Sequence, residues 1–191
     1  MKKIKLKYGE NPRQTPASFE PTKTDDPLVL SRFLLIEGSA LSYNNYCDLD
    51  RLLQTITHVA AAFERNMSGV PKIAVGVKHG NPCGAAISGN SHDAIHNMIA
   101  GEPLSLFGGA VITNFLICDE AWKTPEGKKV SLDMVVAPDF SDHARINLVR
   151  REGRCRLLEN PALHALGVDS LDVSPRDRYV RGGKLQQPNY T

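Results

Sequence analysis

A lysine and a histidine stand side by side as Lys78 and His79, directly after the apolar run 72–77 and before a segment rich in Gly, Pro and Asn. The apolar run has the length and aliphatic character of a buried strand. Reacting groups of α/β proteins gather at the carboxyl ends of strands. A histidine can move a proton near neutral pH, and a neighbouring lysine can stabilise negative charge. The pair is therefore the first candidate for acid/base chemistry.

A plainer interpretation is that both side chains are solvated loop residues. Against it, Asn81-Pro82-Cys83-Gly84 predicts a tight turn whose backbone N–H groups face a ligand. We also expect the positive charge of Lys78 to favour a neutral imidazole at His79, which is the form that accepts a proton.

The Pro82-Cys83 dipeptide resembles half of the Pro-Cys-x-x-Cys element of zinc deaminases. Ala86 stands where the second cysteine would be, and no His-x-Glu or Cys-x-Glu element precedes it. We therefore predict that the chain holds no metal, and we interpret Cys83 as a small buried residue.

Four further residues are candidates for ligand binding, and each has an ordinary structural alternative. Lys7 and Tyr8 could hold a phosphate and a base or sugar, or belong to an edge strand whose lysines oppose aggregation. Gly108 could let the backbone approach a ligand closely, or only ease the entry to a strand. Asp133 could accept a hydrogen bond from a ligand, or be a solvated carboxylate. The sequence has no Walker-type loop and no Gly-x-Gly-x-x-Gly element, so triphosphates and dinucleotides lack a signature.

The elements that must position these residues alternate between strands and helices. This order predicts an α/β fold with a mainly parallel sheet that is covered on both faces. Apolar residues at helical spacing from Leu49 to Phe63 predict a long helix, with Asp48 as its N-cap. Further strands are expected over 110–116, 132–137 and 155–158, helices over 92–100 and 140–151, and a hairpin around Gly182-Gly183.

Composition limits the class of protein. The 191 residues predict a single domain, and 41% hydrophobic and 23% charged residues are typical of a soluble globular protein. The net charge is only +2, which gives no support for nucleic-acid binding. No apolar run is long enough to span a membrane. The spacing of the four cysteines shows no pattern typical of disulfide pairs, which predicts reduced thiols and a cytoplasmic location.

Several segments form an ordered set that is similar to one known family. Together they resemble the transformylase domain of the AICAR transformylase/IMP cyclohydrolase family, and the resemblance covers nearly the whole chain. The segments, in chain order, are Lys7-Tyr8-Gly9-Glu10-Asn11-Pro12-Arg13-Gln14, Leu41-Ser42-Tyr43-Asn44-Asn45, Val77-Lys78-His79-Gly80-Asn81-Pro82-Cys83-Gly84, Pro103-Leu104-Ser105-Leu106-Phe107-Gly108-Gly109 and Val135-Val136-Ala137-Pro138.

The resemblance implies formyl transfer from the co-substrate 10-formyltetrahydrofolate to the exocyclic amine of the purine precursor AICAR. It also implies a three-layer α/β/α unit, similar to cytidine deaminases but without zinc. Lys78 and His79 would be the catalytic pair. Family members often carry Arg where Lys7 stands, and Lys lacks the bidentate fork for phosphate. The positions that match the family's AICAR-binding residues are Lys7, Tyr8, His79, Gly108 and Asp133.

The sequence also departs from the family pattern. We expect residues 1–191 to be the first deaminase-like unit only, without the cyclohydrolase domain and without the second unit, so that IMP ring closure is absent. Three hypotheses follow. The chain is a formyltransferase subunit completed by a second chain or a second copy, a non-catalytic module that binds AICAR or a related phosphoribosyl ligand, or a regulatory paralogue of the full-length enzyme. In every case we expect an oligomer, because a lone unit exposes an apolar docking face.

Overall fold

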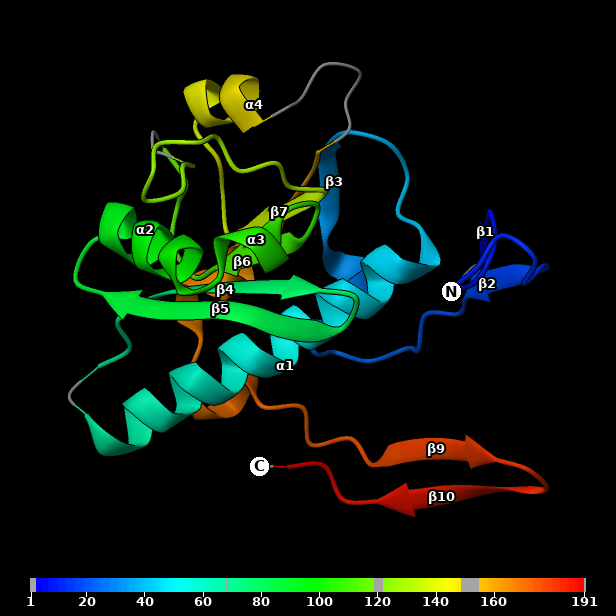
Figure 1. Cartoon of the computed structure of the whole chain (residues 1–191). Coiled ribbons are helices and arrows are strands. Elements are labelled where there is room, and N and C mark those ends of the chain that lie inside the picture. The colour runs from blue at the N-terminus through cyan, green and yellow to red at the C-terminus, as the bar shows by residue number, and fades with distance from the viewer. Residues whose placement is uncertain (1–2, 68, 119–121, 149–154, 191) are drawn as a thin grey trace.

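A six-stranded sheet lies at the centre of the computed structural model, which describes residues 3–67, 69–118, 122–148 and 155–190 (Figure 1). The α/β class expected from the sequence is confirmed. From one edge of the sheet to the other, the strands are β3 (Leu34–Glu37), β8 (Arg156–Glu159), β7 (Met134–Ala137), β6 (Ala110–Thr113), β4 (Lys72–Lys78) and β5 (Asn81–Ser88).

The sheet is mixed, so the expectation of a mainly parallel sheet is wrong for half of it. Strands β6, β7 and β8 run parallel, whereas β4 is antiparallel to both β5 and β6, and β3 is antiparallel to β8. The difference arises because β5 returns directly beside β4, with Lys78 paired to Asn81. The segment Asn81-Pro82-Cys83-Gly84, expected to be a tight turn, is the start of β5, and the turn itself consists of His79 and Gly80.

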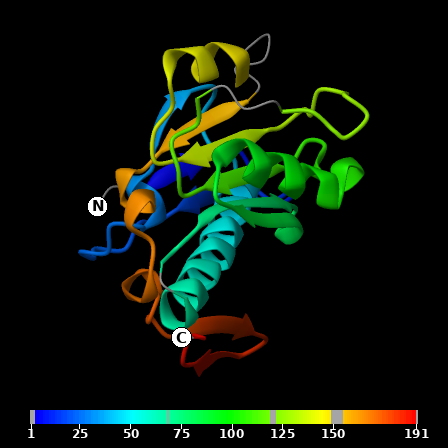
Figure 2. The same ribbon diagram turned by 90° about the vertical axis from the view of Figure 1, so that its left-hand side faces the viewer.

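Helices cover both faces of the sheet and enclose a separate apolar core on each side. Alternate residues of β4 serve the two cores: Ala74 packs with the side chains of α2 (Ser91–Gly101), while Val75 packs with those of α1 (Tyr43–Asn66). The short helices α3 (Pro103–Leu106) and α4 (Asp142–Leu148) lie on the α2 side. In Figure 1, α2 and α3 lie above strands β4 and β5, and α1 lies below them. Figure 2 shows the same layers turned by 90°. The three-layer arrangement is thus confirmed.

Helix α1 begins earlier than the sequence suggested. Its N-cap is Ser42, whose Oγ accepts a hydrogen bond from the N–H of Asn45 at 3.2 Å, while Asn45 Oδ1 accepts from the N–H of Ser42 at 2.9 Å. This reciprocal capping box satisfies two of the helix's free donors. Asp48, expected to be the cap, instead lies inside the helix and is buried. Its side chain is therefore available for another contact.

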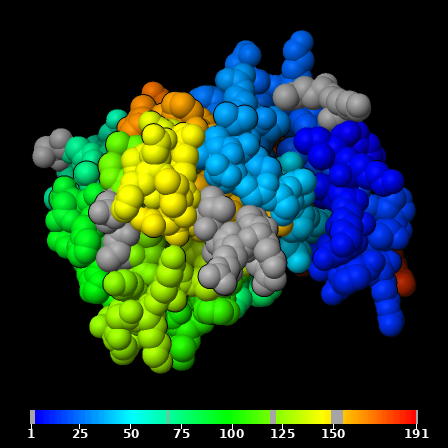
Figure 3. Space-filling view, turned by 90° about the horizontal axis from the view of Figure 1, so that it is seen from above, coloured from blue at the N-terminus to red at the C-terminus, as the bar shows by residue number. Residues whose placement is uncertain are grey.

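Two hairpins lie outside the central sheet. The N-terminal one pairs β1 (Ile4–Leu6) with β2 (Ala17–Phe19), and Phe19 stacks on Tyr46 of α1 with ring centres 4.4 Å apart. Seen from above, this hairpin lies at one side of the molecule (Figure 3). The expected hairpin around Gly182-Gly183 is confirmed as β9 (Arg176–Val180) and β10 (Gly183–Gln187).

The remaining elements agree with the sequence in kind, and differ mostly in their ends. Helix α2 matches the expected helix closely, and strands β6, β7 and β8 lie within or beside the expected ranges. The final residues of the helix expected over 140–151 lie outside the described part of the chain.

No helix among the described residues is both long enough and apolar enough to cross a membrane. Short 3-10 turns occupy Leu30–Arg32, Pro161–Ala165 and Val168–Ser170.

Two leucines of α3 give a matched test of this packing. Leu106 is 1% exposed in the core on the α2 side, whereas Leu104 is 86% exposed. We expect Leu106→Ala to lower the free energy of unfolding by about 2–5 kcal/mol, because it removes buried methyl groups and leaves a cavity. Leu104→Ala should change it by no more than about 0.5 kcal/mol. Urea unfolding of both variants checks this, and equal losses would contradict the assigned core.

Candidate functional site

The turn between β4 and β5 holds a histidine in an uncommon backbone conformation. His79 has a φ angle of 51° and Gly80 one of 73°, and the flanking residues Lys78 and Asn81 pair across the hairpin. Positive φ at both central residues defines a type I′ turn. Glycine adopts this conformation freely, but an L-residue such as histidine does so at a cost of about 1–2 kcal/mol. Such residues persist where the surrounding structure holds them, often at functional sites.

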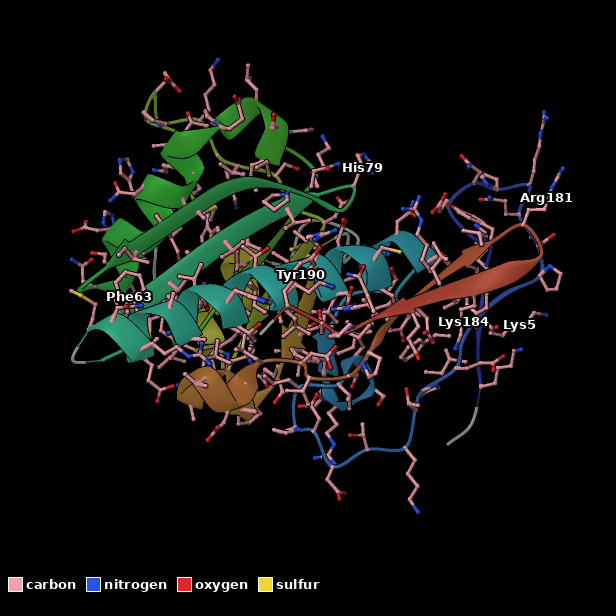
Figure 4. All side chains as sticks on the ribbon, turned by 90° about the horizontal axis from the view of Figure 1, so that it is seen from below. Lys5, Phe63, His79, Arg181, Lys184 and Tyr190 are labelled. Atoms are coloured by element: carbon pink, nitrogen blue, oxygen red, sulfur yellow. The ribbon has the colours of Figure 1, made fainter. Side chains whose placement is uncertain are left out.

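Helix α1 holds this turn through the backbone N–H and carbonyl of Gly80. The Gly80 N–H donates to Oδ1 of Asp48 at 2.7 Å, and the Gly80 carbonyl accepts from Nε of Arg51 at 3.0 Å. Burial raises the pKa of the Asp48 carboxyl; the Gly80 hydrogen bond and the nearby His79 oppose that rise, and Asp133 adds to it. Figure 4 shows His79 at the end of the hairpin, with Phe63 at the distant end of α1.

Lys78 connects the end of β4 to the loop that precedes β6. Its Nζ donates to the carbonyl of Phe107 at 2.6 Å. Gly109 lies against the same strand end, since a Cβ there would be 2.8 Å from the carbonyl oxygen of Val77. This close approach holds the loop next to the lysine.

Gly108 has a left-handed conformation and an open surface. Its φ is 72°, and a Cβ added there would meet nothing within 4 Å. Its N–H donates to the carbonyl of Ser131 at 2.6 Å and is therefore already used. The structure thus leaves room for a ligand beside Gly108, in line with the proposed close approach, but offers no unused N–H there.

The structure brings four of the predicted site residues together. Lys78 and His79 end β4, Gly108 lies in the loop that Lys78 contacts, and Asp133 is joined to that loop because its N–H donates to the carbonyl of Gly109 at 2.9 Å. The Asp133 side chain is exposed. Lysine, imidazole and carboxylate are thus available at one end of the sheet.

The other two predicted residues, Lys7 and Tyr8, lie on a different element. They follow β1 in the N-terminal hairpin, with Lys7 Nζ 5.8 Å from the centre of the Tyr8 ring. The link to the main body runs through α1, where Asn44 Nδ2 donates to the carbonyl of Glu10 at 3.4 Å. Within the described residues, no hydrogen bond or ion pair joins Lys7 or Tyr8 directly to the Lys78-His79 pair.

A pocket of about 550 Å³ opens beside the catalytic candidates, and half-buried Cys83 is part of its wall. Cys83 is the extra residue at a bulge, because Gly76 pairs with Gly84 and Val77 pairs with Pro82. Burial is the main cause of the raised pKa of its thiol, and Lys78 opposes that rise. Cys83 packs against the core on the α2 side, but it is half-buried rather than buried as expected, because it also lines the pocket. The pocket is lined by Lys78, His79, Asn81, Pro82, Cys83, Glu102 and Ser105.

A second pocket, also of about 550 Å³, lies in the loop between β1 and β2, directly after Tyr8. Tyr43, at the start of α1, forms its far wall, so this pocket connects the N-terminal hairpin to the helix that holds the His79 turn. The lining residues are Gly9, Glu10, Arg13, Gln14, Thr15, Pro16, Ala17, Ser18 and Tyr43.

Sequence reasoning missed the residues that support the site. The sequence predicts Asp48 as a helix cap and indicates no role for Arg51, Glu102 or Ser105. Of these residues, only Asp48 has a sequence position that could have indicated its role. It lies four residues before Leu52 and therefore on the apolar face of the helix. In the described part of the chain, no group of three or more His, Cys, Asp or Glu side chains is arranged to hold a metal ion.

Comparisons with known proteins place this arrangement in a family. The family model described as "AICARFT/IMPCHase bienzyme" matches residues 1–190. The "Bifunctional purine biosynthesis protein PurH" of Synechococcus sp. (strain CC9311) is 34% identical over 184 residues, which are 95% of this chain and 32% of that protein. The PurH of Clostridium perfringens (strain SM101 / Type A) is 36% identical over 159 residues, which are 83% of this chain and 29% of that protein. The chain thus spans about a third of the length of these curated relatives.

The type I′ turn gives a test that does not depend on any ligand. Gly80→Ala should lower the free energy of unfolding by about 1–2 kcal/mol, because alanine is disfavoured at a φ of 73°. His79→Gly should not lower it, because glycine adopts positive φ without that cost. Chemical denaturation of both variants measures the difference. Equal destabilisation by the two substitutions would contradict the turn geometry.

Proposed function

Because the chain belongs to the AICARFT/IMPCHase bienzyme family, we propose that it acts in purine biosynthesis by transferring a formyl group from 10-formyltetrahydrofolate to the exocyclic amine of AICAR. The observation that carries this proposal is the Lys78-His79 pair, which the β4–β5 turn presents at a pocket of about 550 Å³. The relatives' printed name, a bifunctional purine biosynthesis protein, supports the same pathway.

In the proposed reaction, the AICAR amine attacks the formyl carbon of the folate. A carbon–nitrogen bond forms to the amine, and the bond from the formyl carbon to N10 breaks. His79 accepts the proton that the amine loses, and a proton reaches N10 as it leaves, so the protons balance. Lys78 donates a hydrogen bond to the oxygen on which negative charge develops. Its present partner, the Phe107 carbonyl at 2.6 Å, is exchanged for that oxygen.

The same proposal assigns AICAR binding to Lys7, Tyr8, His79, Gly108 and Asp133. The exposed carboxylate of Asp133 would accept hydrogen bonds from polar groups of AICAR. The open surface beside Gly108 would admit the ligand. Lys7 would provide positive charge for the phosphate. Lys7 and Tyr8 lie on a separate hairpin, so AICAR would have to bridge that hairpin and the His79 turn.

We further propose that residues 1–191 form one transformylase-like domain that works as an oligomer or with a second chain. The chain spans about a third of its relatives' length. Apolar side chains are exposed around the C-terminal hairpin, among them Val173 at 77%, Tyr179 at 82% and Leu185 at 59%. Such side chains are suited to an interface. A cytoplasmic location stays a prediction.

The alternative is a module that binds AICAR or a related phosphoribosyl ligand without chemistry, or a regulatory paralogue of the full-length enzyme. The observation that favours it is that Nζ of Lys78 already donates to the Phe107 carbonyl at 2.6 Å. Calorimetry with AICAR and a formyl-transfer assay on one preparation distinguish the three cases. Turnover supports the enzyme, binding without turnover supports the module, and the absence of both supports the regulatory role.

Replacing the histidine is the direct test of the proposed mechanism. His79→Ala should lower kcat/KM for formyl transfer by about 100-fold or more, because it removes the general base. AICAR affinity should fall by much less. The measurement combines a spectrophotometric transfer assay with calorimetric titration of AICAR. Where the chain needs a second chain or copy, the assay uses that assembled protein.

His92→Ala is the matched control, since His92 is an exposed histidine on α2 that lines neither pocket. It should leave turnover within about two-fold of the unmodified protein. Full turnover in His79→Ala would remove His79 from the mechanism.

The proposed assembly has its own test. Light scattering at micromolar concentration should show a mass above that of one 21.0 kDa chain. Leu185→Lys should shift the mass toward that of the monomer, because it places a charge on an exposed apolar side chain. A monomer at every concentration would contradict self-association.

A further inference from the structure

Two successive peptide groups in the His79 turn, one on each side of the Gly80 Cα, are held by the same helix. Asp48 accepts from the N–H of Gly80 at 2.7 Å, and Arg51 donates to its carbonyl at 3.0 Å. The two side chains are three residues apart in α1 and so project from neighbouring positions on its surface. We propose that Asp48 and Arg51 form a clamp on the backbone N–H and carbonyl of Gly80 that holds His79 in position for proton transfer, with Asp48 as a positioning residue. The part that concerns proton transfer rests on the proposed function.

The conformation of His79 requires such a clamp. A histidine at a φ of 51° costs free energy, and the turn keeps this shape only while the surroundings determine it. The His79 side chain is exposed and so gains little from packing. The contacts with Asp48 and Arg51 act on the next residue, and the two turn residues share one hairpin loop. Asp48 restrains the His79–Gly80 peptide plane and Arg51 restrains the next one, so together they limit the direction in which the imidazole leaves the backbone.

The carboxylate of Asp48 is buried inside α1, and its Oδ1 accepts the hydrogen bond from the Gly80 N–H at 2.7 Å. Burial raises the pKa of this carboxyl in the folded protein. A raised folded-state pKa means that the group's contribution to stability is present below the unfolded pKa and lost as the pH rises through the folded pKa. An asparagine has the same shape, and its Oδ1 can accept from the Gly80 N–H without a buried charge, so we expect Asp48→Asn to be tolerated at neutral pH. Buried charged groups of this kind are candidates for function.

The charge of Asp48 also suits the proposed chemistry. When His79 accepts a proton, a positive charge develops near Asp48, and the carboxylate stabilises it by electrostatic attraction across the Gly80 peptide. Arg51 and Lys78 are the cations near the turn, and Asp133 is the other carboxylate that acts on Asp48. Removing the Asp48 charge leaves His79 beside two cations and one exposed carboxylate.

The test compares Asp48→Asn, Asp48→Ala and the control Asp50→Asn. Asp50 is also a carboxylate of α1 whose pKa is raised by burial, but its hydrogen bond is with Gln54 Nε2 at 2.9 Å rather than with Gly80, and its ion pair is with Arg176 at 3.8 Å. The charge of Arg51 also acts on Asp50, so this control shows whether any carboxylate near Arg51 has the same effect. Three quantities are measured on each protein: the thermal midpoint, hydrogen exchange of the Gly80 amide, and formyl transfer with AICAR affinity.

Asp48→Ala should speed Gly80 amide exchange at least ten-fold, because the amide loses its acceptor, while the amides of the β4–β6 ladder stay protected. Asp48→Asn should keep the thermal midpoint unchanged or raise it at pH 7, yet lower kcat about ten-fold or more with AICAR affinity within about three-fold. Asp50→Asn should leave Gly80 exchange and turnover unchanged.

Unchanged Gly80 exchange in Asp48→Ala would overturn the clamp. Unchanged turnover in Asp48→Asn would overturn the positioning role, as would a loss of turnover that only follows a lowered thermal midpoint. If the unmodified protein transfers no formyl group, the proposed function fails by itself. The clamp is then decided by Gly80 exchange, which needs no substrate.

Discussion

Strand β4 is paired on both edges and buried on both faces, and this double constraint decides where the rest of the site lies. Its antiparallel partners β5 and β6 hold its edges, while α1 and α2 cover its faces. An interior strand of this kind has no freedom to slide, because a shift of one residue would turn its apolar side chains from one core to the other. Lys78 at its end is therefore held at one place, next to the loop that leads into β6.

Lys78 and His79 are held in place by different contacts. Nζ of Lys78 donates to the Phe107 carbonyl, and Gly109 lies close to the end of β4. His79, in contrast, belongs to a two-residue turn that is hydrogen-bonded to helix α1. The two side chains are adjacent in sequence but supported by different elements. The lysine is therefore held by the loop that precedes β6, and the histidine is held by hydrogen bonds from α1 to the backbone of Gly80. A small movement of α1 would act on the histidine first.

The sequence predicted the strand before Lys78 and the helix that supports the His79 turn better than the elements around them. The apolar run before Lys78 was recognisable as a buried strand, and the apolar residues from Leu49 to Phe63 as a helix. Strand β5 was missed because Asn, Pro and Gly at its start are typical of turns. Pro82 is compatible with a strand here because β5 lies at the edge of the sheet and carries a bulge beside the proline. Asp48 was read as a cap because caps and buried carboxylates share residue types.

The sequence alone determined the residue types of the site, the family, and the apolar pattern that makes β4 and α1. These properties depend on local order along the chain, which periodicity and motif spacing record. The tertiary structure decided which residues meet. The contact between Asp48 and Gly80 joins positions 32 residues apart, and that between Lys78 and Phe107 joins positions 29 apart. Such contacts arise only when packing of the two cores brings separate elements together, and no local pattern encodes that distance.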